Sequence, residues 1–540
     1  MPRRTIDPRA SILLALAALA VNLSVHAATI TVNSLADTDA DDGDCTLREA
    51  ITAANTDAAS GLIAGECAAG SGDDVIAFSE AGTIQPGSAL PPITTPIHID
   101  GYTAPGASVN GLPFTAGNNA VLTVELDGAL AGNVPGLHLE GSGAAGSIIE
   151  GLMINSSANA QCCATSGIYV DEVDGSSAGR ETVIRGNYIG TDKTGMLPRP
   201  KGSRGIYLDF GSTSVRVGSP SGGALDESAV NLISGGDYAG ITANNVSDVV
   251  IRGNMIGTDA AGEAALTNGA QGLSLDGLTD SRIEDNLVSG NNFAGISVMA
   301  DSAGLVIRGN NVGTTADGSG AIPNKGGGIY VAPGAAQGAT IQDILIEENR
   351  VAHNLCADCS GGIVVAEYRN SNTVVGVRLL GNYVYGNAGV EIDLAESSSD
   401  TSYSPIWGVT ENDLDDADSG QANNLQNFPV ITQAVAGPLS ASVNYSFNSE
   451  PNSTYTLQLF RADACDDSGH GGANELLDSD DRMTDGAGDL HGQTVVNLGN
   501  LTGFVTMTAT HSVNGTSEFS ECVALGGETI FEDSFESPVL

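Results

Sequence analysis

Short apolar stretches separated by Gly, Asn and Asp recur between residues 148 and 394. One recurring phrase is close to Ile-Arg-Gly-Asn-x-Ile, and its copies begin at Ile149, Ile184, Ile251, Ile283, Ile307, Ile346 and Leu379. A second phrase, close to Gly-Ile-x-Val, alternates with it, and its glycines are 23 to 38 residues apart. Short β-branched strands that repeat at this interval, without helical periodicity, indicate a solenoid or a propeller.

A parallel β-helix fits these repeats better than a propeller, because propeller blades need four strands and a more even period. We expect residues 136–396 to form this solenoid, with one repeat per coil and coils about 4.8 Å apart. The asparagines that recur in the first phrase then share one register, and we interpret them as a hydrogen-bonded structural stack. They are Asn187, Asn254, Asn286, Asn310, Asn349 and Asn382.

The composition and the hydrophobic pattern of the chain change after about residue 397. Residues 397–427 form an acidic, turn-rich junction, and residues 428–525 contain short alternating strands such as 442–447, 454–459 and 504–509. Alternation of this kind over about 100 residues favours an Ig-like β-sandwich. The predicted fold class is therefore all-β, a parallel β-helix followed by a C-terminal β-sandwich and a tail over residues 526–540.

The N-terminus has the pattern of a secretory signal. Arg3, Arg4 and Arg9 precede an apolar run over residues 12–21, and a cleavage position follows at Ala27. That run is shorter than the roughly 20 apolar residues a membrane helix needs, and no later stretch is long enough. We therefore expect a signal peptide over residues 1–27 and a secreted or cell-surface protein.

Export permits disulfides among the eight cysteines. Proximity suggests the pairs Cys45–Cys67 and Cys465–Cys522. The Cys356-x-x-Cys359 motif is interpreted as a structural disulfide; half a zinc site and a redox pair are the alternatives. The adjacent Cys162 and Cys163 have no explanation from the sequence.

The composition excludes several classes of partner. The chain has 65 acidic and 20 basic residues, a formal net charge of −45, and 71 glycines among 540 residues. Such a chain repels nucleic-acid phosphates and has no basic patch for anionic lipid. Its 41% hydrophobic content is too high for a disordered acidic tail.

Several motifs resemble one bacterial family. Residues 44–51, Asp-Cys-Thr-Leu-Arg-Glu-Ala-Ile, are similar to the signature of the CSLREA-domain proteins, with Thr46 where that signature has Ser. Residues 88–94 and 99–103, the Ile-Gly-Thr-Asp turns at 189–192 and 256–259, and the Asn-Leu-Gln-Asn-Phe-Pro junction at 424–429 resemble the same family. The resemblance implies a right-handed parallel β-helix of the pectin-lyase-like fold, with residues 28–135 as its N-terminal region and cap. It implies export and no established activity.

A polysaccharide lyase of this fold needs calcium-binding carboxylates and a basic residue to take the proton. The candidates are Asp192 and Asp259 in the Gly-Thr-Asp turns, together with Arg185 and Arg252, and Arg308 recurs in the same place. A residue repeated in every copy usually serves the coil, and Asp after Thr commonly forms a turn. We therefore lean against enzymatic activity.

The junction holds Asp413, Asp415, Asp416 and Asp418 without a neighbouring cation, since residues 379–460 contain no Lys or Arg. Alternating carboxylates on a turn suit calcium, the one cofactor we expect, although a solvated acidic linker is the alternative. The preferred function is binding of an extracellular polysaccharide, a cell-surface glycan or another extended polymer along the solenoid face. The alternatives are a pectate-lyase-like enzyme that uses calcium and an Arg base, and a structural spacer or adhesin stalk.

Overall fold

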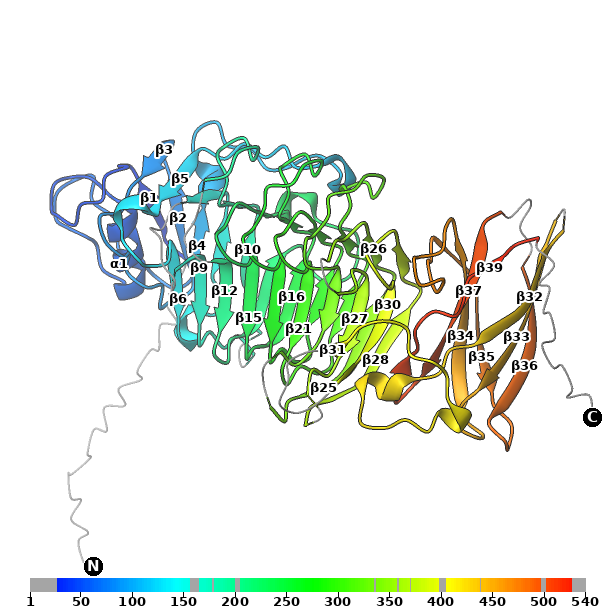
Figure 1. The fold of residues 1–540 in the computed structure, drawn as a ribbon. Coiled ribbons are helices and arrows are strands. Elements are labelled where there is room, and N and C mark those ends of the chain that lie inside the picture. The colour runs from blue at the N-terminus through cyan, green and yellow to red at the C-terminus, as the bar shows by residue number, and fades with distance from the viewer. Residues whose placement is uncertain are drawn as a thin grey trace, which may run out of the picture.

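The computed structural model contains two stacked bodies, a long parallel β-helix and a smaller β-sandwich at its C-terminal end (Figure 1). It describes residues 27–155, 165–176, 179–199, 204–334, 337–356, 359–369, 371–397, 405–437, 439–496 and 502–526. The predicted signal peptide, apart from Ala27, lies outside these residues, as do the Cys162-Cys163 pair and the tail beyond Gly526. Among the described residues, no helix has both the length and the apolar character that crossing a membrane requires.

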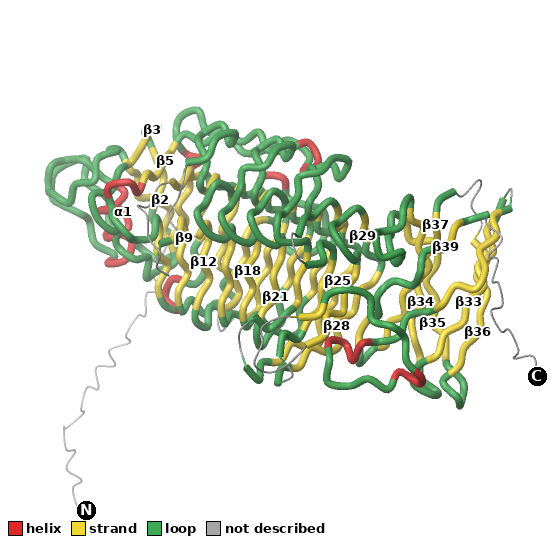
Figure 2. The backbone as a smooth tube through the Cα atoms, in the orientation of Figure 1, coloured by secondary structure: helices red, strands yellow, loops and turns green. Residues whose placement is uncertain are grey.

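Three parallel sheets form the solenoid, and each coil adds one strand to each sheet (Figure 2). The first sheet contains β1 (Thr29–Val32), β2 (Asp74–Phe78), β4 (Ile97–Asp100), β7 (Ile148–Glu150), β10 (Thr182–Arg185), β13 (Thr213–Gly218), β16 (Ser247–Arg252), β19 (Arg282–Glu284), β22 (Val306–Arg308), β25 (Thr340–Glu347) and β28 (Thr373–Leu380). The second sheet contains β3 (Gly82–Ile84), β5 (Val124–Asp127), β8 (Leu152–Asn155), β11 (Tyr188–Ile189), β14 (Leu232–Ile233), β17 (Met255–Ile256), β20 (Leu287–Val288), β23 (Asn311–Val312), β26 (Arg350–Ala352) and β29 (Tyr383–Tyr385). The third sheet contains β6 (Leu137–Glu140), β9 (Ser166–Asp171), β12 (Arg204–Asp209), β15 (Ile241–Asn244), β18 (Leu273–Asp276), β21 (Ile296–Met299), β24 (Ile329–Val331), β27 (Ile363–Ala366), β30 (Ile392–Ser397) and the antiparallel β31 (Pro405–Ile406). The predicted all-β class, a right-handed parallel β-helix with a C-terminal sandwich, is confirmed.

The parallel ladder begins at β1, so residues 28–135 supply the first strands of the solenoid as well as its cap. Inward Ile, Val and Leu side chains of all three sheets form one continuous core. Ile168, Ile206 and Ile241, for example, are fully buried at equivalent positions of successive coils. Burial of these residues in register is the main stabilising term of each coil.

Two ladders of asparagines run along the solenoid, and all their members except the half-buried Asn387 are buried. In the first ladder, each Nδ2 donates to the Oδ1 of the next member at 2.9–3.2 Å. Its members are Asn187, Asn231, Asn254, Asn286, Asn310, Asn349 and Asn382. The predicted stack is confirmed, with Asn231 as a member that the repeat did not reveal. The second ladder has the same geometry and ends on the carboxyl of Glu391; it contains Asn268, Asn291, Asn324, Asn354 and Asn387.

The N-terminal end of the solenoid core is covered by α1 (Leu47–Thr56). Thr46 caps this helix and Glu49 completes the capping box, while Leu47 and Ala50 face the core. Arg48 pairs with Asp37 at 2.9 Å and donates to the carbonyls of residues 88 and 89. The residues that resemble the CSLREA signature therefore build an end cap.

A long segment, residues 104–123, folds over the outside of the second sheet. Phe114 and Leu122 pack there against Tyr188, Met255 and other side chains of that sheet. Asn118 fixes the segment by donating to the carbonyl of Val230 at 3.1 Å. The outer face of the second sheet is thus partly covered by the chain itself.

The C-terminal sandwich consists of two antiparallel layers (Figure 1). One layer contains β32 (Val430–Ala436), β33 (Ala441–Asn448) and β36 (Asp489–Val496). The other contains β34 (Thr454–Ala462), β35 (Glu475–Met483), β37 (Phe504–His511), β38 (Gly515–Thr516) and β39 (Val523–Ala524). Their facing side chains form a separate core.

The sandwich closes the C-terminal end of the solenoid. β38 pairs with β28 at Val377 and Gly515, and Phe460 and Phe519 join the solenoid core. The buried Glu518 accepts hydrogen bonds from the backbone N–H groups of Leu394 at 3.0 Å and Thr410 at 2.7 Å. Because the last coil would otherwise expose unpaired edges, this docking acts as a cap.

The three predicted disulfides are confirmed. Cys45–Cys67 holds the N-terminal cap, Cys465–Cys522 joins two segments of the sandwich, and Cys356–Cys359 lies in the solenoid between β26 and β27. The Cys-x-x-Cys motif is therefore a disulfide in this structure, as the structural interpretation expected.

Candidate functional site

The outward positions of the third sheet form two rows along the solenoid. Side chains alternate along each strand, so Ile168 and Val170 face the core while Tyr169 and Asp171 face outward. The first row is His138, Tyr169, Tyr207, Thr242, Ser274, Ser297, Tyr330, Val364 and Asp393. The second row includes Glu140, Asp171, Asp209, Asn244, Asp276 and Met299. We call these two rows the third-sheet face.

The N-terminal part of this face is a stack of rings. His138 and Tyr169 lie 4.8 Å apart between centroids, and Tyr169 and Tyr207 lie 5.2 Å apart, with nearly parallel planes. The Arg204 guanidinium lies 4.7 Å from the Tyr207 ring and 4.8 Å from the Tyr238 ring. The stack therefore continues through a cation held between two aromatic faces.

Carboxylates lie beside these rings and add to the effect of burial on their ionisation. Tyr169 donates to Asp209 at 3.3 Å, and Asn244 donates to the same carboxylate at 2.8 Å. Burial is the main cause that raises the pKa of both Tyr169 and Tyr207, and the neighbouring Asp209 carboxylate raises it further. Burial lowers the pKa of His138. The tyrosines thus remain protonated and can donate hydrogen bonds. Because they are protonated, they are poor proton acceptors.

The C-terminal part of the face holds an open aromatic hollow with a volume of about 250 Å³. Its lining includes Gln271, Phe293, Ser297, Met299, Tyr330 and Tyr368. Phe293 is 54% exposed, and Trp407 lies 6.5 Å from both the Tyr330 and Tyr368 rings. We call this site the aromatic hollow.

Three small hydroxyl residues, Thr242, Ser274 and Ser297, lie between the stacked rings and the hollow in the first row. The row from Tyr207 to Tyr330 crosses four strand spacings, about 19 Å. A strip of this kind, with rings at both ends and hydroxyls between them, offers stacking and hydrogen bonding along one line.

The predicted catalytic arginines lie elsewhere, on the outside of the first sheet. Arg185 pairs with Glu150 at 2.6 Å, and Arg252 pairs with Asp285 at 2.8 Å. Arg308 pairs with Glu348 at 2.8 Å. In their shared row, basic and acidic side chains follow one another between neighbouring strands. This arrangement suits a role in joining coils.

Asp192 and Asp259 lie in the turns that follow β11 and β17. Asp192 accepts hydrogen bonds from the backbone of residues 194, 196 and 197, and Asp259 accepts them from residues 263 and 264. Both carboxylates therefore hold their own turns. The structure does not join either aspartate to Arg185 or Arg252 through a recorded contact within the described residues, and their catalytic assignment stays a prediction.

Two aspartates of the acidic junction accept hydrogen bonds from other groups of the protein. Asp416 is buried and accepts from Gln426 at 2.6 Å, the Asn427 backbone at 2.9 Å and Ser449 at 2.7 Å. Asp413 accepts from the backbone N–H of Ala417 at 3.1 Å. Burial raises the pKa of Asp416 to about 6 and also raises that of Asp418.

In the described part of the chain, one cluster of three possible metal-ligating side chains has its ligand atoms within 4.8 Å of one another, and this cluster is not at the junction. It contains His98, Asp100 and Glu150 on the first sheet. Glu150 is already bonded to His98 at 2.7 Å and to Arg185, which opposes a further cation. The predicted calcium ligands Asp413, Asp415, Asp416 and Asp418 remain a prediction.

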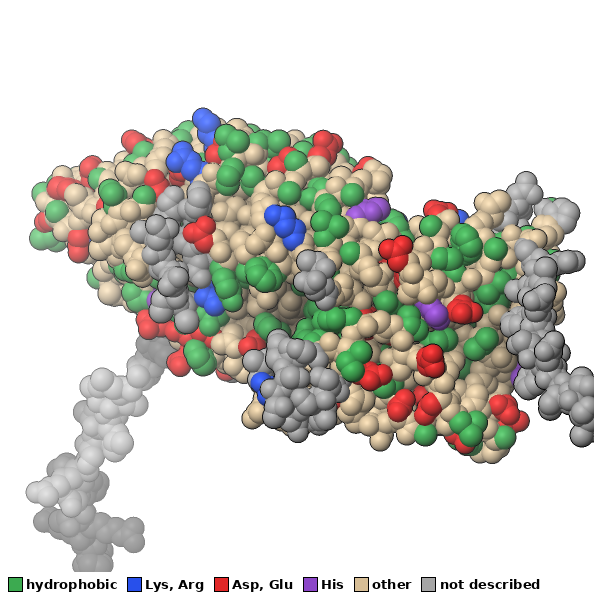
Figure 3. Space-filling view, in the orientation of Figure 1, with side chains coloured by type: hydrophobic (Ala, Val, Ile, Leu, Met, Phe, Trp, Pro, Cys, Tyr) green, Lys and Arg blue, Asp and Glu red, His purple; other side chains and the backbone are tan. Residues whose placement is uncertain are grey.

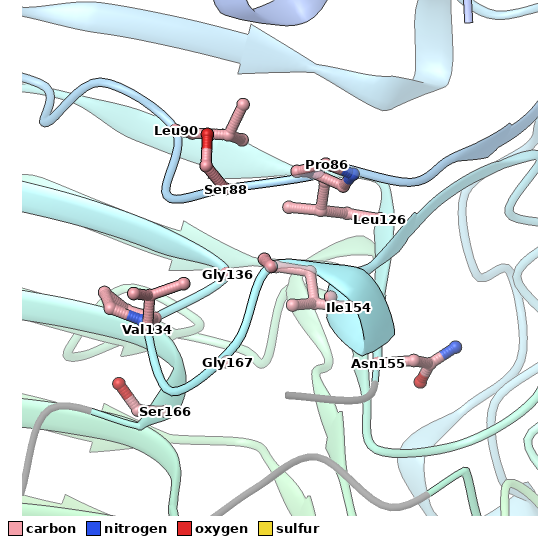
Figure 4. A pocket seen from close by; sticks show the side chains of 13 residues that line it. Pro86, Ser88, Leu90, Leu126, Val134, Gly136, Ile154, Asn155, Ser166 and Gly167 are labelled. Carbon is pink, nitrogen blue, oxygen red and sulfur yellow. The ribbon is translucent and has the colours of Figure 1, made fainter. Parts of the chain in front are cut away.

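A further pocket lies near the N-terminal end, between the turns that carry Pro86, Ser88 and Gly136 (Figure 4). It is lined mostly by apolar side chains and has a volume of about 10 Å³. That space approximates one water molecule and is too small for a sugar ring.

Sequence reasoning did not find the third-sheet face. The signal was present in the Gly-Ile-x-Val phrase, whose variable position is Tyr at Tyr169, Tyr207 and Tyr330. Phe293 and Trp407 come from a turn and from the junction, and only the folded chain brings them to this face.

Comparison with known proteins adds a family match over part of the solenoid. The model of a family described as periplasmic copper-binding protein (NosD) matches residues 226–403, about a third of the chain. No curated protein matches the chain.

Solved structures with parallel β-helices are also similar to the chain, at low identity. The enzymatically active domain of bacteriophage CBA120 tailspike protein 2 is 14% identical, with a TM-score of 0.31, covering 81% of this chain and 68% of its own. An alginate lyase from Paenibacillus sp. str. FPU-7 is 16% identical, with a TM-score of 0.38, covering 66% and 96%. The Yersinia enterocolitica family 28 exopolygalacturonase is 9% identical, with a TM-score of 0.20, covering 58% and 66%. We infer nothing about the site from these likenesses.

Proposed function

We propose that the protein is exported and binds a polysaccharide along the third-sheet face, with the aromatic hollow as its main subsite. The observation that carries this proposal is the gathering of rings on one face of a chain that is only 4% aromatic. His138, Tyr169, Tyr207 and Tyr330 lie in one register along a rigid solenoid, which suits an extended polymer of repeating units. Three disulfides support an oxidising compartment.

Exposed rings beside hydroxyl groups are the physical requirement for sugar binding. Phe293 offers an accessible ring, and Ser297 and Gln271 supply polar groups within the same hollow. Desolvation of such a ring by a bound sugar contributes affinity, while the polar groups set orientation.

A carbohydrate array containing neutral, amino and acidic polysaccharides tests the proposal with the full-length mature chain. The Phe293→Ala variant removes an exposed ring from the hollow, and we expect it to weaken binding about fivefold to tenfold. Leu197→Ala is the matched control, because Leu197 is 61% exposed in a turn beside the second sheet. Binding that is unchanged in Phe293→Ala contradicts the proposed subsite. A wild-type chain that binds no glycan leaves the structural-spacer alternative.

A second candidate function is cleavage of a polysaccharide, as in a pectate-lyase-like enzyme. The observation in its favour is that Asp171, Asp209 and Arg204 lie on neighbouring coils of one face. The raised pKa of Tyr169 and the stacked position of Arg204 weigh against proton abstraction there. Incubation with polygalacturonate and calcium distinguishes the two functions, because a rise in ultraviolet absorbance from unsaturated uronates identifies a lyase.

We also retain the proposal that the junction acids Asp413, Asp415 and Asp418 bind calcium, with Asp416 as the buried member of the cluster. It is supported by mutual repulsion, since Asp413 contributes to the raised pKa of Asp418 after burial. Calorimetry with calcium tests it, and an absence of heat above a chelator control contradicts it.

A further inference from the structure

Asp276 lies at the rim of the aromatic hollow. It is the direct neighbour, on the adjacent strand, of Met299, which lines the hollow. The Asp276 side chain is half-buried, and within the described residues the structure records no hydrogen bond or ion pair for its carboxylate. Burial and the nearby charge of Asp301 raise the pKa of Asp276. Keeping a partly desolvated carboxylate ionised without a nearby cation costs free energy. A ligand that places a positive charge beside Asp276 therefore binds more tightly.

The rest of the third-sheet face also carries mainly negatively charged side chains. Glu140, Asp171 and Asp209 follow one another in the second row. The guanidinium of Arg204, on the same face, lies close to the rings of both Tyr207 and Tyr238. The acidic side chains also outnumber the basic ones over the visible surface (Figure 3). A uronate polymer would therefore approach carboxylates along most of this strip.

We infer that the aromatic hollow takes a sugar that carries a protonated amine, which pairs with Asp276, so that the ligand is an amino-sugar polymer. This inference rests on the proposed polysaccharide-binding function and specifies its ligand class. The ring of Phe293 or Tyr330 supplies a stacking surface for the sugar, and the Asp276 carboxylate supplies the counter-charge. Uronates have the opposite charge and are disfavoured by the same groups.

Equilibrium titrations at pH 7 test the ligand class with the full-length mature chain and four soluble probes. The probes are hexamers of glucosamine, N-acetylglucosamine and galacturonate, together with hexalysine as a cation without sugar rings. We expect the glucosamine hexamer to bind the tightest and the galacturonate hexamer the weakest.

Two variants with the same change in charge locate the effect. Asp276→Asn is expected to weaken glucosamine binding about fivefold and to leave binding of the N-acetylglucosamine hexamer within twofold. Glu263→Gln is the control, because Glu263 is exposed in a turn beside the second sheet. It should leave all four affinities unchanged.

Each contrary outcome has one meaning. Tighter binding of galacturonate than of glucosamine, or equal loss in Asp276→Asn and Glu263→Gln, overturns the amino-sugar inference and leaves polysaccharide binding standing. Hexalysine that binds as tightly as the glucosamine hexamer also overturns it, because charge alone would then account for binding. If the protein binds neither these hexamers nor any polysaccharide on the carbohydrate array, the proposed function fails as well.

Discussion

Asn286 occupies the middle of the first asparagine ladder, and its replacement by alanine gives the sharpest test of how the solenoid is held together. Asn286 Oδ1 accepts from the backbone N–H of Asn254 at 3.0 Å and from Asn254 Nδ2 at 3.0 Å. Asn286 Nδ2 donates to the carbonyl of Ile251 at 2.9 Å and to Asn310 Oδ1 at 2.9 Å. The side chain is fully buried, so water does not replace these bonds.

The size of the effect follows from the groups left without partners. Asn286→Ala orphans the buried backbone N–H of Asn254 and the carbonyl of Ile251, each at about 1–3 kcal/mol, and leaves a small cavity. We expect the free energy of unfolding to fall by about 4 kcal/mol, measured by urea denaturation followed by circular dichroism.

Asn292→Ala is the matched control for this experiment. Asn292 is exposed; its Nδ2 donates to the carbonyl of Gly269 at 3.4 Å, and its Oδ1 accepts from the exposed Lys325 Nζ at 3.3 Å. Its replacement should change the free energy of unfolding by less than about 0.5 kcal/mol. A loss below about 1 kcal/mol for Asn286→Ala, or an equal loss in both variants, would refute the stabilising role of the ladder.

Three further predictions concern the ends of the solenoid. Burial raises the pKa of Glu391 from an ordinary value of 4.5 to about 8, so the free energy of unfolding falls as pH rises between these values. In urea titrations, Glu391→Gln should reduce this fall and be more stable than the wild type at pH 9. The double variant Cys45→Ala/Cys67→Ala opens a loop with a sequence separation of 22 and should lower the free energy of unfolding by about 3 kcal/mol. In limited proteolysis, the cap of the fully reduced wild type should be cleaved as readily as the cap of this variant. Arg48→Ala removes the pair with Asp37 and two carbonyl contacts and should cost about 2 kcal/mol in the same denaturation assay; an unchanged midpoint would contradict the structural reading of this motif.

Most of the architecture could be predicted from the sequence, because each coil repeats the same chemistry. The recurring asparagines and the Gly-Ile-x-Val phrase indicate one register and one strand per repeat. Asn231 was missed because it follows Val230 in a segment that lacks the Ile-Arg-Gly-Asn phrase. The second ladder was missed for a similar reason, since its members follow Thr, Gly, Pro or His in the turns.

The candidate site was less accessible to sequence reasoning. The outward tyrosines can be read once the register is known, because they occupy the variable position of a repeated phrase. Phe293 from a turn and Tyr368 from a loop after β27 also line the aromatic hollow, and Trp407 from the junction packs against Tyr368. Those three residues share no spacing in the chain, and only tertiary packing brings them together.

The central claim, polysaccharide binding at the aromatic hollow, has a direct optical test. Trp407 is the single tryptophan of the chain, and it packs against Tyr330 and Tyr368 at the hollow. Titration with an array-positive glycan should therefore change tryptophan emission in a saturable way, with weaker binding in Phe293→Ala and unchanged binding in Leu197→Ala. A glycan that binds the wild type while leaving Trp407 emission unchanged would contradict this location of the site.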